Sequence, residues 1–218
     1  MAKGTRPGPP TGLETGRREE LIEIACLLFA EKGFDGSSLQ EIADKFGILK
    51  GSLFHYIRTK NELLYEIIRS VYVGAEGRIW SIMDEEGSAT TKLHKVIIAY
   101  VTYIADHQPW VTVWLHDLGA LDPGHRKEIT WFEERDRGRL TMLVTEAQRE
   151  GSIASDLDPQ IVAFSLLGAM NWVHRWYRPG RLSPREIAEV LARVHLRLDV
   201  DDAGRSRPVG AGQSVEPM

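Results

Sequence analysis

Apolar residues recur at intervals of three and four positions along most of this chain, and this spacing most constrains its fold. Of the 30 glycines and prolines, 11 lie in the first 12 and last 20 residues, which leaves 19 for the 186 residues between. Helical periodicity therefore continues over long uninterrupted segments. Only 111–115 resembles a strand, and it has no hairpin partner, so we assign it to a helix. The pattern predicts an all-α protein.

Cysteine use and hydropathy indicate where such a chain works. Cys26 is the single cysteine, so no internal disulfide can form. The most apolar stretch, 161–173, has 13 residues, whereas a membrane span needs about 18 or more. The first residues lack an apolar run followed by a cleavage site. We therefore expect a cytoplasmic protein that does not enter a membrane.

Glycines, prolines and capping residues divide the chain into segments. We expect mobile tails at 1–15 and 199–218, a small helical domain at 16–64 and a larger helical domain at 65–198. The helices expected in the small domain, with the helix that follows it, are 16–32, 39–46, 50–57 and 60–83. Those expected in the larger domain are 90–106, 109–121, 124–150, 159–178 and 184–198.

The small domain has the sequence pattern of a helix-turn-helix. Ser38 and Glu41 form a capping box at the start of a short helix, and Gly47 ends that helix. The next helix follows after only three residues, as in two helices joined by a tight turn. Residues 45–61 carry a charge of +4 and no acid, although the whole chain has a net charge of −4. A short basic segment on an acidic protein suits contact with a polyanion.

Side chains at the start of the second helix suit contact with DNA. In a helix-turn-helix this helix enters the major groove, and its first residues meet the base edges. Lys50 brings a cation, Gly51 allows close approach, and Ser52 offers a hydroxyl. Leu53 and Ile57 are spaced to face the core. For the cations alone, a solvated basic face on any helical protein is the more ordinary interpretation.

Residues 17–64 resemble the DNA-binding domain of the TetR family of bacterial repressors, most clearly at 29–34, 42–43, 50–56 and 60–64. The resemblance implies an all-α homodimer that binds a palindromic operator in double-stranded DNA and is released by a ligand bound to its larger domain. Leu49 stands where the family commonly has Ser or Thr, and Ile57 where it commonly has an aromatic residue. We therefore expect a frayed first turn in the second helix. By matching position, the expected operator contacts are Ser38, Lys50, Gly51, Ser52, His55, Tyr56 and Lys60.

All six tryptophans lie between Trp80 and Trp176, outside the small domain. Trp110 and Trp114 are four residues apart, as are Trp172 and Trp176, which is typical both of helix packing and of an aromatic-lined pocket. Packing would account for most of them, Trp80 included, and the alternatives stay open for Trp114 and Trp172.

The last two expected helices favour a dimer. The helix at 159–178 is apolar nearly all round, with one stripe that runs from Ile161 through Phe164 and Trp172 to Trp176. Such a helix must be buried on several sides. Two such helices from each chain can form a four-helix interface, and the resemblance supports this mode of dimerisation.

Polar residues on this apolar helix need water, a partner or a ligand. The helix end can simply emerge into solvent, or Arg175 and Arg178 can form the anion-binding mouth of a pocket. Residues 168–179 are similar to a helix of TetR-family regulators of fatty-acid and steroid catabolism, which implies an acyl-CoA effector. The expected ligand-binding residues are Trp110, Trp114, His116, Asn171, Trp172, Arg175, Trp176 and Arg178.

The sequence contains no clear motif for an enzymatic or metal site. His116 and Asp117, with His107 or His125, form the best local cluster, but their spacing matches no metal-ligand motif. The chain has no nucleophile elbow and no phosphate-binding glycine loop. We expect no cofactor, no metal and no catalysis. Together with the family resemblance, this predicts a ligand-responsive repressor. The alternatives are a multidrug-type effector in the same family, or a helical enzyme acting on CoA thioesters.

Overall fold

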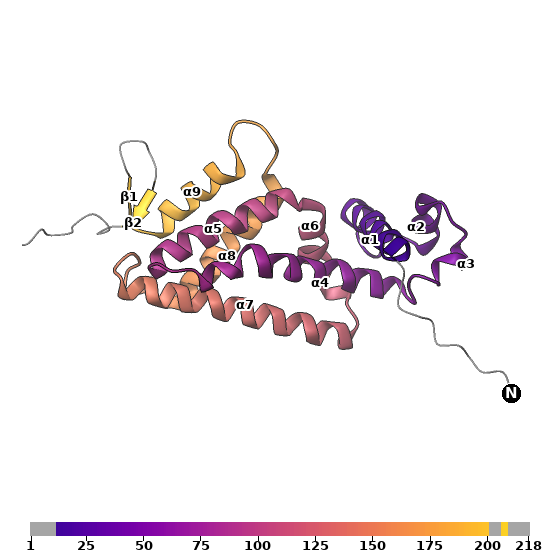
Figure 1. The fold of residues 1–218 in the computed structure, drawn as a ribbon, viewed down its shortest axis with the longest axis horizontal. Coiled ribbons are helices and arrows are strands. Elements are labelled where there is room, and N and C mark those ends of the chain that lie inside the picture. The colour runs from indigo at the N-terminus through magenta and orange to yellow at the C-terminus, as the bar shows by residue number, and fades with distance from the viewer. Residues whose placement is uncertain (1–11, 201–205, 209–218) are drawn as a thin grey trace, which may run out of the picture.

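The computed structural model describes residues 12–200 and 206–208, and over this part of the chain it is dominated by helices (Figure 1). Of the expected tails at 1–15 and 199–218, residues 1–11, 201–205 and 209–218 lie outside the described residues. The helices are α1 (Gly12–Lys32), α2 (Leu39–Phe46), α3 (Lys50–Leu53), α4 (Lys60–Arg78), α5 (Ala89–Asp106), α6 (Gln108–Asp117), α7 (Pro123–Arg149), α8 (Pro159–Trp176) and α9 (Pro184–His195), with 3₁₀ helices η1 (Trp80–Asp84) and η2 (Leu118–Ala120).

The helix-turn-helix forms where the caps predicted it. Ser38 Oγ accepts from the backbone N–H of Glu41, and a carboxylate oxygen of Glu41 accepts from the N–H of Ser38. Gly47 ends α2 with a φ of 77°, which glycine adopts without strain. Leu53 and Ile57 are buried, as their spacing predicted, and Cys26 packs in the same core. The helix-turn-helix prediction is therefore confirmed.

Helix α3 is shorter than we expected. It covers Lys50–Leu53, and residues 54–56 form a turn where the prediction continued the helix to Ile57. Leu49 gives no side-chain cap, as its chemistry requires, yet the first turn forms because Leu49 O accepts from the N–H of Ser52 at 2.9 Å. The expected fraying of that first turn is wrong, and the helix is shortened at its other end.

Helix α4 connects the small domain to the larger one. It packs against α1 and α6, and also against η1, α5 and α7. Figure 1 shows α1 to α3 at one end of an elongated molecule and α5, α7, α8 and α9 at the other. The helix ends at Arg78 instead of continuing to Met83, and η1 turns the chain toward α5. A movement of α4 would therefore reach both domains.

Two observations correct the expected ends of the domains. Helix α1 begins at Gly12, inside the expected N-terminal tail. A short antiparallel pair joins β1 (Leu198–Val200) to β2 (Ser206–Pro208), so part of the expected C-terminal tail forms strands, contrary to the expectation of helices alone. Both corrections concern the margins of the fold. Among the described residues, no helix is long and apolar enough to span a membrane.

Candidate DNA-binding surface and ligand cavity

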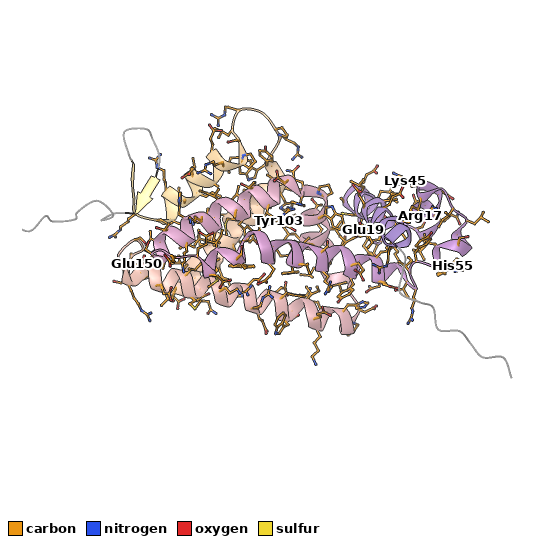
Figure 2. All side chains as sticks on the ribbon, viewed as in Figure 1. Arg17, Glu19, Lys45, His55, Tyr103 and Glu150 are labelled. Carbon is orange, nitrogen blue, oxygen red and sulfur yellow. The ribbon has the colours of Figure 1, made fainter. Side chains whose placement is uncertain are left out.

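The turn and α3 lie on the outer end of the small domain. Figure 2 shows Lys45 and His55 at this end, away from the larger domain. Lys50, Gly51 and His55 are exposed. Within the part of the chain that the structure describes, Lys45 and Lys50 form no ion pair, so their charges are available to an outside partner. The exposed backbone at Gly51 leaves room for a close approach, as a DNA groove requires.

The other predicted operator contacts are more engaged within the protein. Ser38 is exposed, but its hydroxyl already belongs to the capping box with Glu41. Tyr56 is half-buried and packs edge to face on Phe46, with ring centroids 5.6 Å apart. Ser52 is also half-buried. Less of each of these three side chains is therefore available to an outside partner than of Lys50 or His55.

Lys60 has a structural partner that the sequence did not reveal. Its ammonium donates to the backbone oxygen of Phe34 and lies 4.2 Å from the centre of the Phe34 ring. It therefore fastens the start of α4 to the loop that follows α1. The predicted phosphate contact at Lys60 has to compete with this internal site.

The larger domain contains a partly open cavity of about 220 Å³. Residues from α4, η1, α5, α6, α7 and α8 line it, and most of them are apolar or aromatic. Among the lining residues are Tyr72, Trp80, Tyr100, Trp114, Leu167 and Asn171. A partly open, mostly apolar cavity with a few polar groups is the usual form of a small-molecule site.

One wall of the cavity carries charge. Glu133, Asp136 and Arg137 lie on one face of α7 at i, i+3 and i+4. Burial raises the pKa of Asp136 more than the hydrogen bond and charge of Arg135 lower it. Elsewhere in the lining, Tyr100 Oη donates to Asn171 Oδ1 at 2.9 Å. The cavity thus has polar groups at two places within an apolar lining.

Three further polar atoms in the wall, Tyr72 Oη, Trp80 Nε1 and Trp114 Nε1, lack a hydrogen-bond partner among the described residues. Tyr72 Oη and Trp114 Nε1 are buried without a hydrogen bond of good geometry, although their rings pack edge to face, 5.4 Å between centroids. Burial raises the pKa of the Tyr72 phenol, so this group stays protonated. Unpaired buried groups of this kind are costly and need an explanation.

The structure distributes the eight predicted ligand residues over three places. Trp114 and Asn171 line the cavity. Trp110 is half-buried between the two domain cores, and His116 is exposed beside His174, with ring centroids 5.6 Å apart. The others lie on the outside of the protein, away from the cavity lining: Trp172, Arg175, Trp176 and Arg178.

The placement of the tryptophans corrects our interpretation of them. Trp80 is 3% exposed and lies in the core, as expected, although it also borders the cavity. Trp131, Trp172 and Trp176 are exposed and pack in no core, contrary to the expectation that packing accounts for most of the tryptophans. The arginine on the cavity wall is Arg137 of α7, and Arg175 is not there. Sequence reasoning missed Arg137, although the spacing of Glu133, Asp136 and Arg137 places them on one helix face.

Helix α8 keeps an apolar stripe on the surface of the single chain, and the expected burial of that stripe depends on the second chain of the predicted four-helix interface. Trp172 is 61% exposed, and Ile161, Phe164 and Trp176 are exposed along the same stripe. On α9, Val190 and Val194 are exposed as well. Apolar patches of this size on a single chain mark a surface that meets another molecule.

The histidines of the predicted cluster are dispersed. His107 stacks on Tyr103, and His125 stacks on Tyr65 and lies 3.7 Å from Asp122. His116 faces His174 of α8 instead. Among the described residues, no group of three or more histidine, cysteine or acidic side chains is arranged to hold a metal ion.

The fold and these two sites define the class: a helical protein with an N-terminal helix-turn-helix and a larger helical domain that contains a mostly apolar cavity. Residues 21–67 match the family model described as bacterial regulatory proteins, tetR family. Residues 86–198 match the model described as tetracyclin repressor-like, C-terminal domain. The chain belongs to the TetR family of bacterial regulatory proteins, as its N-terminal motifs indicated.

Similar proteins are repressors of transcription. The HTH-type transcriptional repressor KstR2 of Rhodococcus jostii (strain RHA1) is 34% identical over 179 residues, which cover 80% of this chain and 86% of that protein. KstR2 of Mycobacterium tuberculosis (strain ATCC 25618 / H37Rv) is 30% identical over 173 residues, 78% of this chain and 85% of that protein.

Two solved structures share the fold. The crystal structure of AibR in complex with isovaleryl coenzyme A and operator DNA matches with a TM-score of 0.76 at 26% identity, over 82% of this chain and 97% of that one. The structure of the ketosteroid transcriptional regulator KstR2 of Mycobacterium tuberculosis matches with a TM-score of 0.77 at 26% identity, over 83% and 95%.

Proposed function

We propose that this protein is a ligand-responsive transcriptional repressor that binds a palindromic operator as a homodimer. The observation that carries the proposal is the outward surface at α3, where Lys45, Lys50 and His55 are exposed at the end of the molecule. The family and the repressors similar to this chain support the same function. Because the chromosome is in the cytoplasm, we place the protein there.

The homodimer joins through α8 and α9. Their exposed apolar side chains, Trp172 at the centre of the stripe among them, are covered when two copies meet around a twofold axis. A twofold dimer presents two copies of α3, and these suit the two half-sites of a palindrome when they lie about 34 to 36 Å apart.

The effector is an acyl-CoA thioester whose acyl group enters the cavity. The cavity lining is mostly apolar, and the carboxylates of Glu133 and Asp136 would repel CoA phosphates, so the CoA part remains outside. AibR, to which this chain is similar, was solved with isovaleryl coenzyme A. An oxygen on the acyl group would give Tyr72 and Trp114 the partner that they lack.

Helix α4 transmits the ligand signal. Val71, Tyr72 and Ala75 of α4 line the cavity, and Lys60 at the other end of the same helix holds the small domain. An acyl group that displaces the cavity side of α4 therefore changes the position of α3. The ligand favours a dimer in which the two α3 helices no longer match successive grooves.

A binding titration tests the proposal. The operator is first selected from a pool of random duplexes, and anisotropy of the labelled duplex is then followed while acyl-CoA thioesters, free fatty acids, free CoA or drug-like cations are added. We expect release by particular acyl-CoA thioesters and by none of the other compounds. Indifference to every acyl-CoA would remove the effector assignment and leave DNA binding intact.

A cavity variant separates the site from indirect effects. Leu167 lines the cavity and is partly buried, so Leu167→Trp should fill the space, keep DNA binding and weaken release by the acyl-CoA at least tenfold. Leu157→Trp is the matched control, because Leu157 is exposed in the loop before α8. Equal release from both variants would place the effector elsewhere.

Two other functions are distinguished by the same samples. A multidrug-type effector would be favoured by release with drug-like cations, which the carboxylates of Glu133 and Asp136 would attract. An enzyme acting on CoA thioesters would consume them during the titration, and thioester loss is measured directly. We infer that the chain does not catalyse, because its relatives are regulators of transcription.

A further inference from the structure

Leu49 is an exposed apolar residue at a helix start, where a polar capping residue is usual. It is the N-cap of α3, its side chain is 81% exposed, and it makes no capping hydrogen bond. Serine, threonine, asparagine or aspartate at this position would satisfy a free N–H of the helix. Leu49 therefore gives up a local stabilisation and places a branched apolar side chain in water.

The position of Leu49 indicates what covers it. The next residue is Lys50, whose exposed cation is available to a phosphate, and Lys45 precedes it on α2 with an exposed ammonium. Along the chain, Leu49 therefore lies between two exposed cations, directly before the first residue of the recognition helix. In a helix-turn-helix the start of this helix meets the base pairs of the major groove.

Only one group in the major groove favours an apolar side chain. Each base edge there offers hydrogen-bond donors or acceptors, except for the C5-methyl group of thymine. A leucine placed against any other base would leave polar base atoms without water or a partner. Against a thymine methyl, it removes apolar surface from water on both sides.

We propose that Leu49 reads a thymine methyl group, so that each half-site of the operator has a thymine facing the start of α3. The proposal rests on the proposed DNA-binding function and adds a base preference to it. Leu49 is then a specificity-determining residue, and the missing cap is the local cost of that contact. Residues that break a local stability rule in this way are expected where function requires them.

Uracil substitution tests the contact directly, because uracil differs from thymine only by that methyl group. Each thymine of the selected operator is replaced in turn, symmetrically in both half-sites, and affinity is measured by anisotropy. The wild type should lose about 4-fold in affinity per half-site at one position, as expected for burial of one methyl group. Leu49→Ala should bind the thymine and uracil duplexes equally.

A second variant separates base reading from folding. Leu49→Ser supplies the missing cap, so its Tm should rise slightly while its discrimination between thymine and uracil disappears. A purely structural role for Leu49 would give a lower Tm and unchanged discrimination. Leu157→Ser is the control, since it removes an exposed leucine in the loop before α8 and should change neither quantity.

The outcomes are distinct. If no thymine position responds to uracil in the wild type, or if the response persists in Leu49→Ala, the proposal is overturned while DNA binding stands. If the response disappears only in Phe54→Ser, the exposed phenylalanine at the end of α3 is the reader and Leu49 is not. Failure to select any duplex would contradict the proposed function itself.

Discussion

Asn61, near the start of α4, is bound to Ala120 at the end of η2 by a hydrogen bond from the side-chain Nδ2 to the backbone oxygen at 2.7 Å. The same side chain accepts from the backbone N–H of Asp122 at 3.0 Å. Asn61 thus attaches the helix that carries the small domain to the segment between α6 and α7. Trp114 and Leu115 of α6 line the cavity at the other end of this connection.

Asn61→Ala should weaken communication between the cavity and the DNA-binding surface. Without these two bonds, a shift of α6 still reaches the small domain through α4 and through the packing of α6 against α1, so communication is weakened and not lost. We expect operator affinity to change less than threefold and the effector concentration for half-release to rise about tenfold, measured by anisotropy. Gln40→Ala is the control, because the Gln40 amide binds Asp44 on the surface of α2. Normal release from Asn61→Ala would show that this connection is not used.

Mutation of Lys50 should change operator affinity, whereas mutation of Lys60 should change the stability of the fold. Lys50→Ala removes an exposed cation, so it should lower operator affinity and reduce the slope of log affinity against log salt by about 1 per subunit, with no change in Tm. Lys60→Ala removes the bond to Phe34 and the contact with its ring, so it should cost about 1 to 2 kcal/mol of unfolding free energy. An unchanged Tm for Lys60→Ala would contradict the structural role.

Glu150 should make stability depend on pH. Its carboxylate accepts from the backbone N–H groups of Ala89 and Thr90, both at 2.8 Å, and so caps α5; Figure 2 shows it at the end of α7. Burial raises its pKa, but the hydrogen bonds from Thr90 and Ala89 outweigh burial and hold the pKa below its usual value. The stabilisation is therefore present above about pH 4.3 and is lost as the pH falls through the lowered pKa.

Glu150→Gln measures that contribution. The variant should be less stable than the wild type by about 1 kcal/mol at neutral pH, and the difference should shrink as the pH approaches 3, followed by urea unfolding. Glu134→Gln is the control, an exposed carboxylate on the same helix. A difference that grows on acidification would have the wrong sign for this explanation.

Trp172→Glu should separate the dimer. Trp172 is 61% exposed on the apolar stripe of α8, and a carboxylate there would be buried without a partner in the interface. We expect a monomer in sedimentation at micromolar concentration, together with weakened operator binding. Trp131→Glu tests the specificity of the result, because Trp131 is also exposed but lies on α7. A dimer that survives Trp172→Glu but not Trp131→Glu would move the interface to α7.

Local signals predicted most of the fold, because caps and glycines act within a few residues. Ser38, Glu41 and Gly47 fixed the ends of α2 in the sequence as they do in the structure. Contacts between distant segments were not predictable in this way. Lys60 meets Phe34 across 26 residues, and nothing in the spacing of either residue indicates it.

The cavity was predicted only in part, for a related reason. Trp114 and Asn171 were identified because aromatic and polar residues are conspicuous on apolar helices. The sequence did not identify the part of the cavity lining that includes Trp80 and Arg137. The apolar residues of α7 are too few and too scattered to show from the sequence which face of this helix points inward. Trp172 was ambiguous, since an apolar residue in the sequence looks the same whether it meets its own core or a second chain.

Footprinting of the selected operator tests the central claim most directly. Two copies of α3, one from each chain, should protect two short segments in successive major grooves on one face of the duplex, centred about 10 base pairs apart and related by the operator's twofold axis. An effective acyl-CoA should abolish both protections together. Protection of a single segment, uniform protection without a centre, or protection that survives exchange of Lys45 and Lys50 for glutamate would contradict the account.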